Sequence, residues 1–265
     1  MQYGICGGLD ISKAAAIAGF DFVERTVGDL LKPREDRAAF DAALAETRAA
    51  GLPCPVVNCF IPGDMKITGE AVDTPALERF AATAFERAAE AAVDVIVFGS
   101  GGARRNPDGF DPAAAHQQLV RFGQMLGALA GEGGVTVAVE PLNRKECNVL
   151  TTVGQCAALV REVDHPAVRL LVDAYHLLQD GDSLQDVTDN ADLLVHVHVA
   201  TVPNRLAPGT EESDLRSFFD ALARAGYDGR VSIEGKIPDP DADLPKALAH
   251  MRAMEERARR SPDSS

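Results

Sequence analysis

The sequence has little that would indicate a secreted or membrane protein. Its first residues, Met-Gln-Tyr-Gly-Ile-Cys-Gly-Gly, contain neither a basic leader nor a long apolar stretch, so we expect no secretory signal and no membrane-spanning helix. Five cysteines are present, an odd number, and no two of them form a Cys-x-x-Cys pair. This spacing disfavours a disulfide framework and a zinc knuckle. We therefore expect a cytoplasmic protein with reduced cysteines.

Basic residues are also few compared with acidic ones. The chain has 26 Lys and Arg against 40 Asp and Glu, a formal net charge of −14. Nucleic-acid binding normally requires a basic surface that replaces counterions on the phosphates, so a nucleic-acid partner is disfavoured. The acidic excess instead indicates a well-solvated surface. With 46% hydrophobic residues, the chain can bury a large core, and this disfavours intrinsic disorder.

No linker-like segment divides the chain. Its 265 residues are close to the roughly 250 that are typical of a barrel of eight βα units. The one clearly biased segment is 257–265, where charge and a lack of apolar residues predict a frayed tail. We therefore predict a single domain over residues 1–256.

Short β-branched apolar runs alternate with helical segments along the whole chain. Such runs are typical of buried parallel strands. Eight are predicted, at 3–6, 20–24, 55–60, 94–98, 135–140, 168–173, 193–199 and 230–234. Eight strands, each followed by a helix, favour a closed α/β barrel, the (β/α)8 or TIM barrel, over an open sheet. A doubly wound sheet is the alternative, but Gly4, Gly7 and Gly8 lack the spacing of its phosphate-binding fingerprint.

Each of the last four predicted strands ends with a residue that can bind a metal ion. These residues are Glu140, Asp173, His198 and Glu234, and the carboxyl ends of barrel strands lie together at one end of the barrel. Three unpaired carboxylates there would repel each other, so a bound cation is the natural way to keep them ionised. Mixed oxygen and nitrogen ligation indicates one divalent ion, Mn²⁺ before Co²⁺ or Mg²⁺.

Three residues near these strand ends have more than one interpretation. Glu24 also ends a predicted strand, and it is either a solvated loop residue or helix cap, or part of the site. His196 points to the same face as His198 but lies one layer deeper, which favours a hydrogen-bonded supporting role over metal binding. Among the cysteines, only Cys147 is expected near the site, as a small packing residue.

The glycine-rich loop 99–102 also has two interpretations. Its backbone amides could bind a phosphate, with Arg104 or Arg105 nearby. An ordinary glycine-rich barrel loop that shapes substrate specificity is the more common case.

The most specific motif in the chain is Glu140-Pro-Leu-Asn-Arg followed by Glu146. Four further motifs accompany it, namely Val-Asp173-Ala-Tyr-His176, His196-Val-His198, Asn204-Arg205-Leu-Ala-Pro-Gly209 and Ser-Ile-Glu234. Together they resemble the xylose-isomerase-like barrels, and within that family the sugar isomerases and epimerases, which include ketose 3-epimerases and hydroxypyruvate isomerases. The resemblance covers nearly the whole chain at the level of strand order.

The resemblance implies two sets of site residues: the metal ligands Glu140, Asp173, His198 and Glu234, and the substrate contacts Glu146, His176 and Arg205. Glu140 and Glu234 are the implied catalytic pair. One would remove a proton beside a carbonyl and the other would return one, through an enediolate that the metal stabilises. Transfer on opposite faces gives epimerisation, and transfer on one face gives isomerisation. The segment Val199 to Pro203, before Arg205, is slightly longer than in the related epimerases and lacks their acidic residue.

The predicted function is a divalent-metal-dependent epimerase or isomerase of a small keto-sugar or related keto-acid. A dehydratase or lyase of a keto-inositol or of dehydroshikimate is the alternative, because the same enediolate can expel a β-hydroxyl group. A non-catalytic sugar-binding barrel is a third interpretation. The family also contains DNA-repair endonucleases with three zinc ions, but this chain lacks the additional His ligands and the basic surface that they need. Barrels of this family often form homo-oligomers, so self-association stays open.

Overall fold

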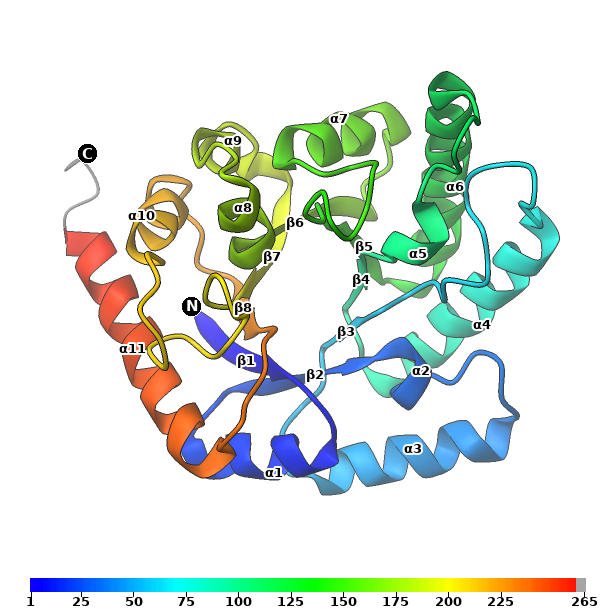
Figure 1. The fold of residues 1–265 in the computed structure, drawn as a ribbon. Coiled ribbons are helices and arrows are strands. Elements are labelled where there is room, and N and C mark those ends of the chain that lie inside the picture. Colours follow the sequence, from blue (N-terminus) through cyan, green and yellow to red (C-terminus); the bar gives the residue numbers. More distant parts are fainter. Residues whose placement is uncertain (261–265) are drawn as a thin grey trace.

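The computed structural model describes residues 1–260. Within them, eight parallel strands follow the chain order around a closed barrel, and β1 pairs with β8 to close it. Figure 1 shows the helices as an outer ring around these strands. The predicted (β/α)8 barrel is therefore confirmed. The strands are β1 Gln2–Cys6, β2 Phe22–Thr26, β3 Val56–Asn58, β4 Val95–Phe98, β5 Thr136–Val139, β6 Val168–Asp173, β7 Leu194–Val199 and β8 Arg230–Ile233.

Helices connect successive strands on the outside of the barrel. The last helix, α11, packs against α1 and α10 and completes the ring (Figure 1). The helices are α1 Leu9–Ala18, α2 Val27–Leu30, α3 Arg37–Ala49, α4 Thr74–Ala91, α5 Gly101–Arg104, α6 Pro112–Gly133, α7 Val153–Val163, α8 Ala174–Asp180, α9 Gln185–Asp189, α10 Arg216–Arg224 and α11 Pro240–Arg260, with a 3₁₀ turn at Ala191–Leu193. None of the helices in the described part of the chain is long and apolar enough to cross a membrane.

Two strands differ from their predicted bounds by more than one residue at an end. β3 is limited to Val56–Asn58 because Pro55 has no N–H group for the ladder and Cys59 has a left-handed φ of 53°. β2 begins later than expected, at Phe22, and continues to Thr26. The side chain of Thr26 then accepts a hydrogen bond from the Asp29 amide in the first turn of α2, so the strand leads directly into the helix.

The C-terminal helix α11 is longer than the sequence suggested. It continues to Arg260, and Ala258 is buried in it. The Arg257 guanidinium also lies 3.2 Å from the Asp220 carboxylate of α10. The prediction that the chain frays from Arg257 is therefore wrong for residues 257–260, which belong to this helix. The remainder of the predicted tail, 261–265, lies outside the described residues.

Side chains alternate along each strand between the helices and the barrel interior, as the two-residue period of a strand requires. Residues paired in a parallel ladder share a face: Gly4 pairs with Phe22, and His198 pairs with both Asp173 and Ser232. The lower interior is a buried apolar layer, here called the barrel floor, formed by Phe22, Val56, Val95, Val97, Ala138 and Leu171. In each strand that supplies a residue to this layer, the following inward-facing residues lie closer to the carboxyl end of the barrel.

Gly4 leaves the space that the Phe22 ring occupies in the barrel floor. A Cβ atom on Gly4 would lie 2.2 Å from Phe22 Cε2, and Phe22 is only 2% exposed, so its ring has little room to move. We expect Gly4→Ala to lower the free energy of unfolding by about 1–3 kcal/mol, the usual cost of overpacking. Urea denaturation measures this change.

Gly28→Ala is the matched control for the Gly4 substitution. Gly28 is exposed in α2, and its Cβ would lie 3.9 Å from Thr26 Oγ1, an ordinary contact. Because alanine favours a helix more than glycine does, the free energy of unfolding should be unchanged or increase by up to about 1 kcal/mol. Equal stabilities of the two variants would show that the Phe22 ring is not held in place as described.

Candidate active site

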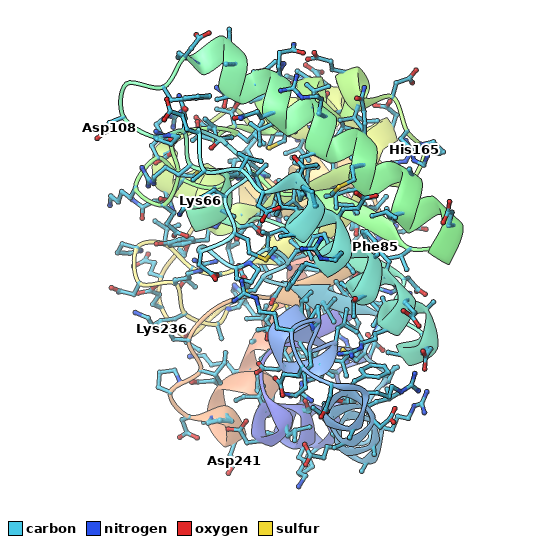
Figure 2. All side chains as sticks on the ribbon, turned by 90° about the vertical axis from the view of Figure 1, so that its right-hand side faces the viewer. Lys66, Phe85, Asp108, His165, Lys236 and Asp241 are labelled. Atoms are coloured by element: carbon cyan, nitrogen blue, oxygen red, sulfur yellow. The ribbon has the colours of Figure 1, made fainter. Side chains whose placement is uncertain are left out.

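One inward-facing position at the end of each strand, or directly after it, contributes to the candidate site at the carboxyl end of the barrel. Figure 2 shows this end on one side of the molecule, where Lys66, Asp108 and Lys236 lie in loops that follow strands, whereas His165, which precedes β6, lies on the other side. Each position comes two residues after an inward-facing residue of the same strand, so it faces inward as well. The positions are Cys6, Glu24, Asn58, Gly99, Glu140, Asp173, His198 and Glu234.

Three carboxylates and two histidines come together here. Potential ligand atoms of Glu140, Asp173, His176 and Glu234 all lie within 4.8 Å of one another. His198 borders this group, because its Nδ1 lies 3.1 Å from Glu140 Oε1 and 3.5 Å from Glu234 Oε2. The structure thus brings the four predicted metal ligands to one place. The close group that contains the three carboxylates, however, includes His176, a predicted substrate contact, instead of His198.

The pKa values of the two glutamates shift in opposite directions. Burial raises the pKa of Glu140; the hydrogen bond with His198 opposes this rise, and the charge of Glu234 adds to it. Burial alone would also raise the pKa of Glu234, but His198 and Arg205 outweigh it and lower that pKa to about 2. One carboxyl group therefore holds a proton far more readily than the other.

The donor atoms at this position fit a divalent cation. Asp173 Oδ1 accepts a hydrogen bond from Tyr175 N, but the buried Asp173 Oδ2 has no hydrogen-bond partner among the described residues. Burial lowers the pKa of His198, but the charges of Glu24 and Glu234 overcome this effect and raise the pKa well above its ordinary value. Surroundings that favour a proton on a buried imidazole also favour a metal ion. The mixture of carboxylate oxygens and imidazole nitrogen suits Mn²⁺-like ions.

Asn143 determines the orientation of His176. Its backbone N–H donates to His176 Nδ1 over 3.1 Å, so Nδ1 is the acceptor and the proton of the neutral ring is on Nε2. Within residues 1–260, this buried Nε2 has no hydrogen-bond partner, and it lies 3.5 Å from Asp173 Oδ2. His176 thus presents an N–H donor to the site.

Arg205 reaches the same carboxylates despite the unusual segment that precedes it. Its guanidinium pairs with the carboxylate of Glu234 and lies 3.7 Å from Asp173 Oδ2 and 3.4 Å from Glu146 Oε1. The guanidinium carbon is also 4.7 Å from the centre of the Tyr175 ring, a favourable cation–π distance. Arg205 and Glu146 therefore lie together at the edge of the carboxylate group.

A cavity of about 400 Å³ adjoins these groups, a volume within the usual range of small-molecule sites. Besides Glu140, His176 and Glu234, it is lined by Glu146, Arg205, Asn58 and Cys59. Asn58 is 5% exposed, and its Oδ1 has no hydrogen-bond partner in the described chain. Because buried amides are rarely left unpaired, this group is available to a ligand.

The loop after β4 supports Glu140, and the guanidinium groups of its two arginines do not line the cavity. A Cβ at Gly99 would lie 2.3 Å from Glu140 Oε2, so the glycine leaves room for this carboxylate. Arg104 is fully buried and donates to three backbone oxygens, at the ends of β4 and β5 and in the next loop. Arg105 donates to a backbone oxygen of the loop after β5. Since neither guanidinium lines the cavity, the phosphate interpretation gains no support.

Two further groups lie beside the site: Glu24, whose role the sequence left open, and Cys6, which was missed. Glu24 is fully buried, not a solvated loop residue, and its Oε1 lies 2.9 Å from His198 Nε2. Cys6 forms a second close group with Glu24 and His198, whereas Cys147 is a buried packing residue, so the expectation that only Cys147 lies near the site was wrong. The two-residue spacing from Phe22 to Glu24 was the available signal, because it repeats the alternation of the other strands.

Comparison with known proteins agrees with this architecture. The family model described as xylose isomerase-like TIM barrel matches residues 12–254. A ketose 3-epimerase of Arthrobacter globiformis is 37% identical over 106 residues, which are 40% of this chain and 36% of that protein. A 3-dehydro-D-guloside 4-epimerase of Escherichia coli is 34% identical over 132 residues, 49% of this chain and 50% of that protein. The crystal structure of a 3-keto-D-glucoside 4-epimerase from E. coli has a TM-score of 0.77 and 26% identity, and the match covers 96% of this chain and 99% of that one.

Proposed function

This chain belongs to the xylose isomerase-like TIM barrel family, and we propose that it is a divalent-metal-dependent epimerase or isomerase of a small keto-sugar or related keto-acid. One observation carries the proposal: the carboxylates of Glu140 and Glu234 line the same cavity and belong to one close group with Asp173 and His176. The relatives named as epimerases support it. The five free cysteines support the further proposal that the enzyme works in a reducing compartment such as the cytoplasm.

Four residues would hold one divalent ion: Glu140, Asp173, His198 and Glu234. The unpaired oxygen of Asp173 and the direction of His198 Nδ1 toward the carboxylates support this assignment. Mn²⁺ suits the donor set best, with Co²⁺ or Mg²⁺ as alternatives. When bound, the ion supplies positive charge that makes a proton beside a carbonyl group more acidic.

The two glutamates would transfer the proton. Glu234, with its low pKa, is ionised at neutral pH and can accept a proton from the substrate carbon. Glu140 lines the same cavity and, after it takes up a proton from solvent, can deliver that proton to the substrate. Return to the opposite face of the carbon inverts its configuration, whereas return to the neighbouring carbon on one face isomerises the substrate.

Three further residues would bind the substrate oxygens. His176 Nε2–H and the Arg205 guanidinium can donate hydrogen bonds to an oxygen that gains negative charge as the proton leaves. The exposed carboxylate of Glu146 lies beside Arg205 and can accept a hydrogen bond from a substrate hydroxyl group. These contacts would hold the carbon to be deprotonated next to the two glutamates.

Hydrogen exchange with solvent tests the proposed reaction directly. The protein, loaded with Mn²⁺, is incubated with a panel of ketoses and keto-acids in deuterated water, and the Mn²⁺ is removed before NMR locates any deuterium in the products. We expect deuterium at one carbon beside a carbonyl group, without loss of water. Loss of water would instead indicate the dehydratase, and binding without any exchange would indicate a sugar-binding barrel.

We also propose that Asn58 binds a hydroxyl group of the substrate. Asn58→Leu keeps the size of the side chain but removes both its donor and its acceptor, so we expect KM to rise about tenfold with a smaller change in kcat. Asn148→Leu is the control, because Asn148 is exposed on a neighbouring loop and does not line the cavity. Equal KM values for the two variants would remove Asn58 from the substrate site.

A further inference from the structure

A buried network of hydrogen-bonding groups surrounds the Glu24 carboxylate, inside the barrel next to the site. Glu24 Oε1 lies 2.9 Å from His198 Nε2. Its other oxygen, Oε2, accepts a hydrogen bond from Ser232 Oγ over 2.7 Å and lies 2.9 Å from His196 Nε2. All four residues are fully buried, so water does not compete for these contacts. Three donors from two strands, β7 and β8, thus converge on one carboxylate from β2.

This network determines which way the His198 ring faces. A carboxylate only accepts hydrogen bonds, so the nitrogen next to Glu24 must be Nε2–H. The other ring nitrogen, Nδ1, then points to the opposite side, where it lies 3.1 Å from Glu140 Oε1 and 3.5 Å from Glu234 Oε2. A histidine that binds a metal usually donates its second ring N–H to a carboxylate in this manner.

We propose that Glu24 is a positioning residue, which holds His198 so that Nδ1 is directed at the metal position, and that His196 and Ser232 hold Glu24 in turn. The proposal rests on the proposed metal site. It gives a role to His196, which lies one layer below His198 and whose ring centre is 5.0 Å from that of His198. His196 would then support the ligand through the shared carboxylate without binding the ion itself.

Glu24→Gln tests the proposal with the smallest change of shape. The amide replaces one of the two acceptor oxygens with an NH₂ group, which then faces either His198 Nε2 or the pair formed by His196 and Ser232. We expect the dissociation constant for Mn²⁺, measured by calorimetry without substrate, to increase by about 10–100-fold. An unchanged dissociation constant in a folded Glu24→Gln protein would overturn the proposal.

Glu255→Gln is the matched control. Glu255 is also a carboxylate with several donors, since it accepts hydrogen bonds from Tyr3 Oη and the N-terminal ammonium group, but it lies at the opposite end of the barrel. This substitution should lower the melting temperature and leave Mn²⁺ binding unchanged. If Glu255→Gln weakens Mn²⁺ binding as much as Glu24→Gln does, the loss reflects general stability and the positioning role is wrong.

Ser232→Ala keeps the proposal testable if Glu24→Gln does not fold. It removes one of the three donors to Glu24 but none of the contacts that His198 makes itself. Mn²⁺ binding should weaken by about two- to tenfold, less than in Glu24→Gln, because His198 keeps its own contact with Glu24. No change in binding would contradict the claim that Ser232 holds Glu24.

NMR of the metal-free protein separates this proposal from the proposed function. The His198 Nε2–H proton should resonate far downfield and exchange slowly in the original protein. It should lose both properties in Glu24→Gln and change less in Ser232→Ala, where His198 keeps its contact with Glu24. If the original protein fails to bind Mn²⁺ while this signal behaves as expected, the metal-dependent function fails and the orientation of His198 stands. If Mn²⁺ binds but the signal is absent, the positioning role of Glu24 fails.

Discussion

Glu234→Gln should lower kcat by roughly a hundred- to ten-thousandfold, the range expected when a group that transfers protons is lost. Glutamine has the same shape and can still accept a hydrogen bond from Arg205, but it cannot take a proton from carbon. The carboxylate of Glu234 is ionised at neutral pH, and the ionised form is the one that can accept a proton from carbon. Steady-state kinetics with the substrate identified by deuterium exchange measures the change.

Because Glu234 is also a proposed metal ligand, the Mn²⁺ content of the variant must be measured together with its turnover. A variant that retains Mn²⁺ and loses solvent exchange assigns the loss to proton transfer. Glu70→Gln is the control, since Glu70 is exposed in the loop after β3, at the same end of the barrel. A kcat for Glu234→Gln within tenfold of the original would exclude Glu234 as a catalytic base.

Removal of divalent metal should abolish activity, and Mn²⁺ should restore it. Since the ligands come from four different strands, the ion should bind the folded protein and not the unfolded chain. At a free Mn²⁺ concentration one hundred times its dissociation constant, the free energy of unfolding should increase by about 2.7 kcal/mol. Thermal denaturation with and without Mn²⁺, after treatment with a chelator, measures this increase.

Asp173→Asn provides the variant for the metal experiment. Asp173 caps α8 by accepting a hydrogen bond from Tyr175 N. Asparagine caps helices equally well, so α8 should still begin at Ala174. The change removes only the charge of the ligand. The variant should fold, lose the Mn²⁺-dependent increase in stability and lose activity. Full activity of the chelator-treated protein, with no metal found by elemental analysis, would contradict the metal requirement.

The barrel could be predicted from the sequence because its strands are short apolar runs, buried on both faces and separated by helical segments. The grouping of Glu140, Asp173, His198 and Glu234 followed from the same pattern, since equivalent ends of parallel strands must meet once the barrel closes. The strand ends themselves were less predictable. The left-handed backbone at Cys59, which stops β3, has no signal in a residue type that rarely adopts it.

Contacts across the barrel interior could not be predicted. Glu24 and His198 are 174 residues apart, and their strands face each other only in the closed barrel. The contacts of Arg104 could not be predicted from the sequence either. An arginine in a glycine-rich loop normally extends into solvent, but here it donates to backbone oxygens at strand ends, which converge only after folding. Short-range patterns identify each strand, whereas such partners depend on the assembled interior.

The barrel floor has a consequence for the order of events during turnover. Phe22 and the other residues of this layer are buried within the described chain and occupy the interior below the polar groups. Substrate can then reach the site only through the opening formed by the loops after the strands. Product has to leave through the same opening before the next substrate enters. A non-reactive sugar analogue bound in this opening should block both substrate entry and product release.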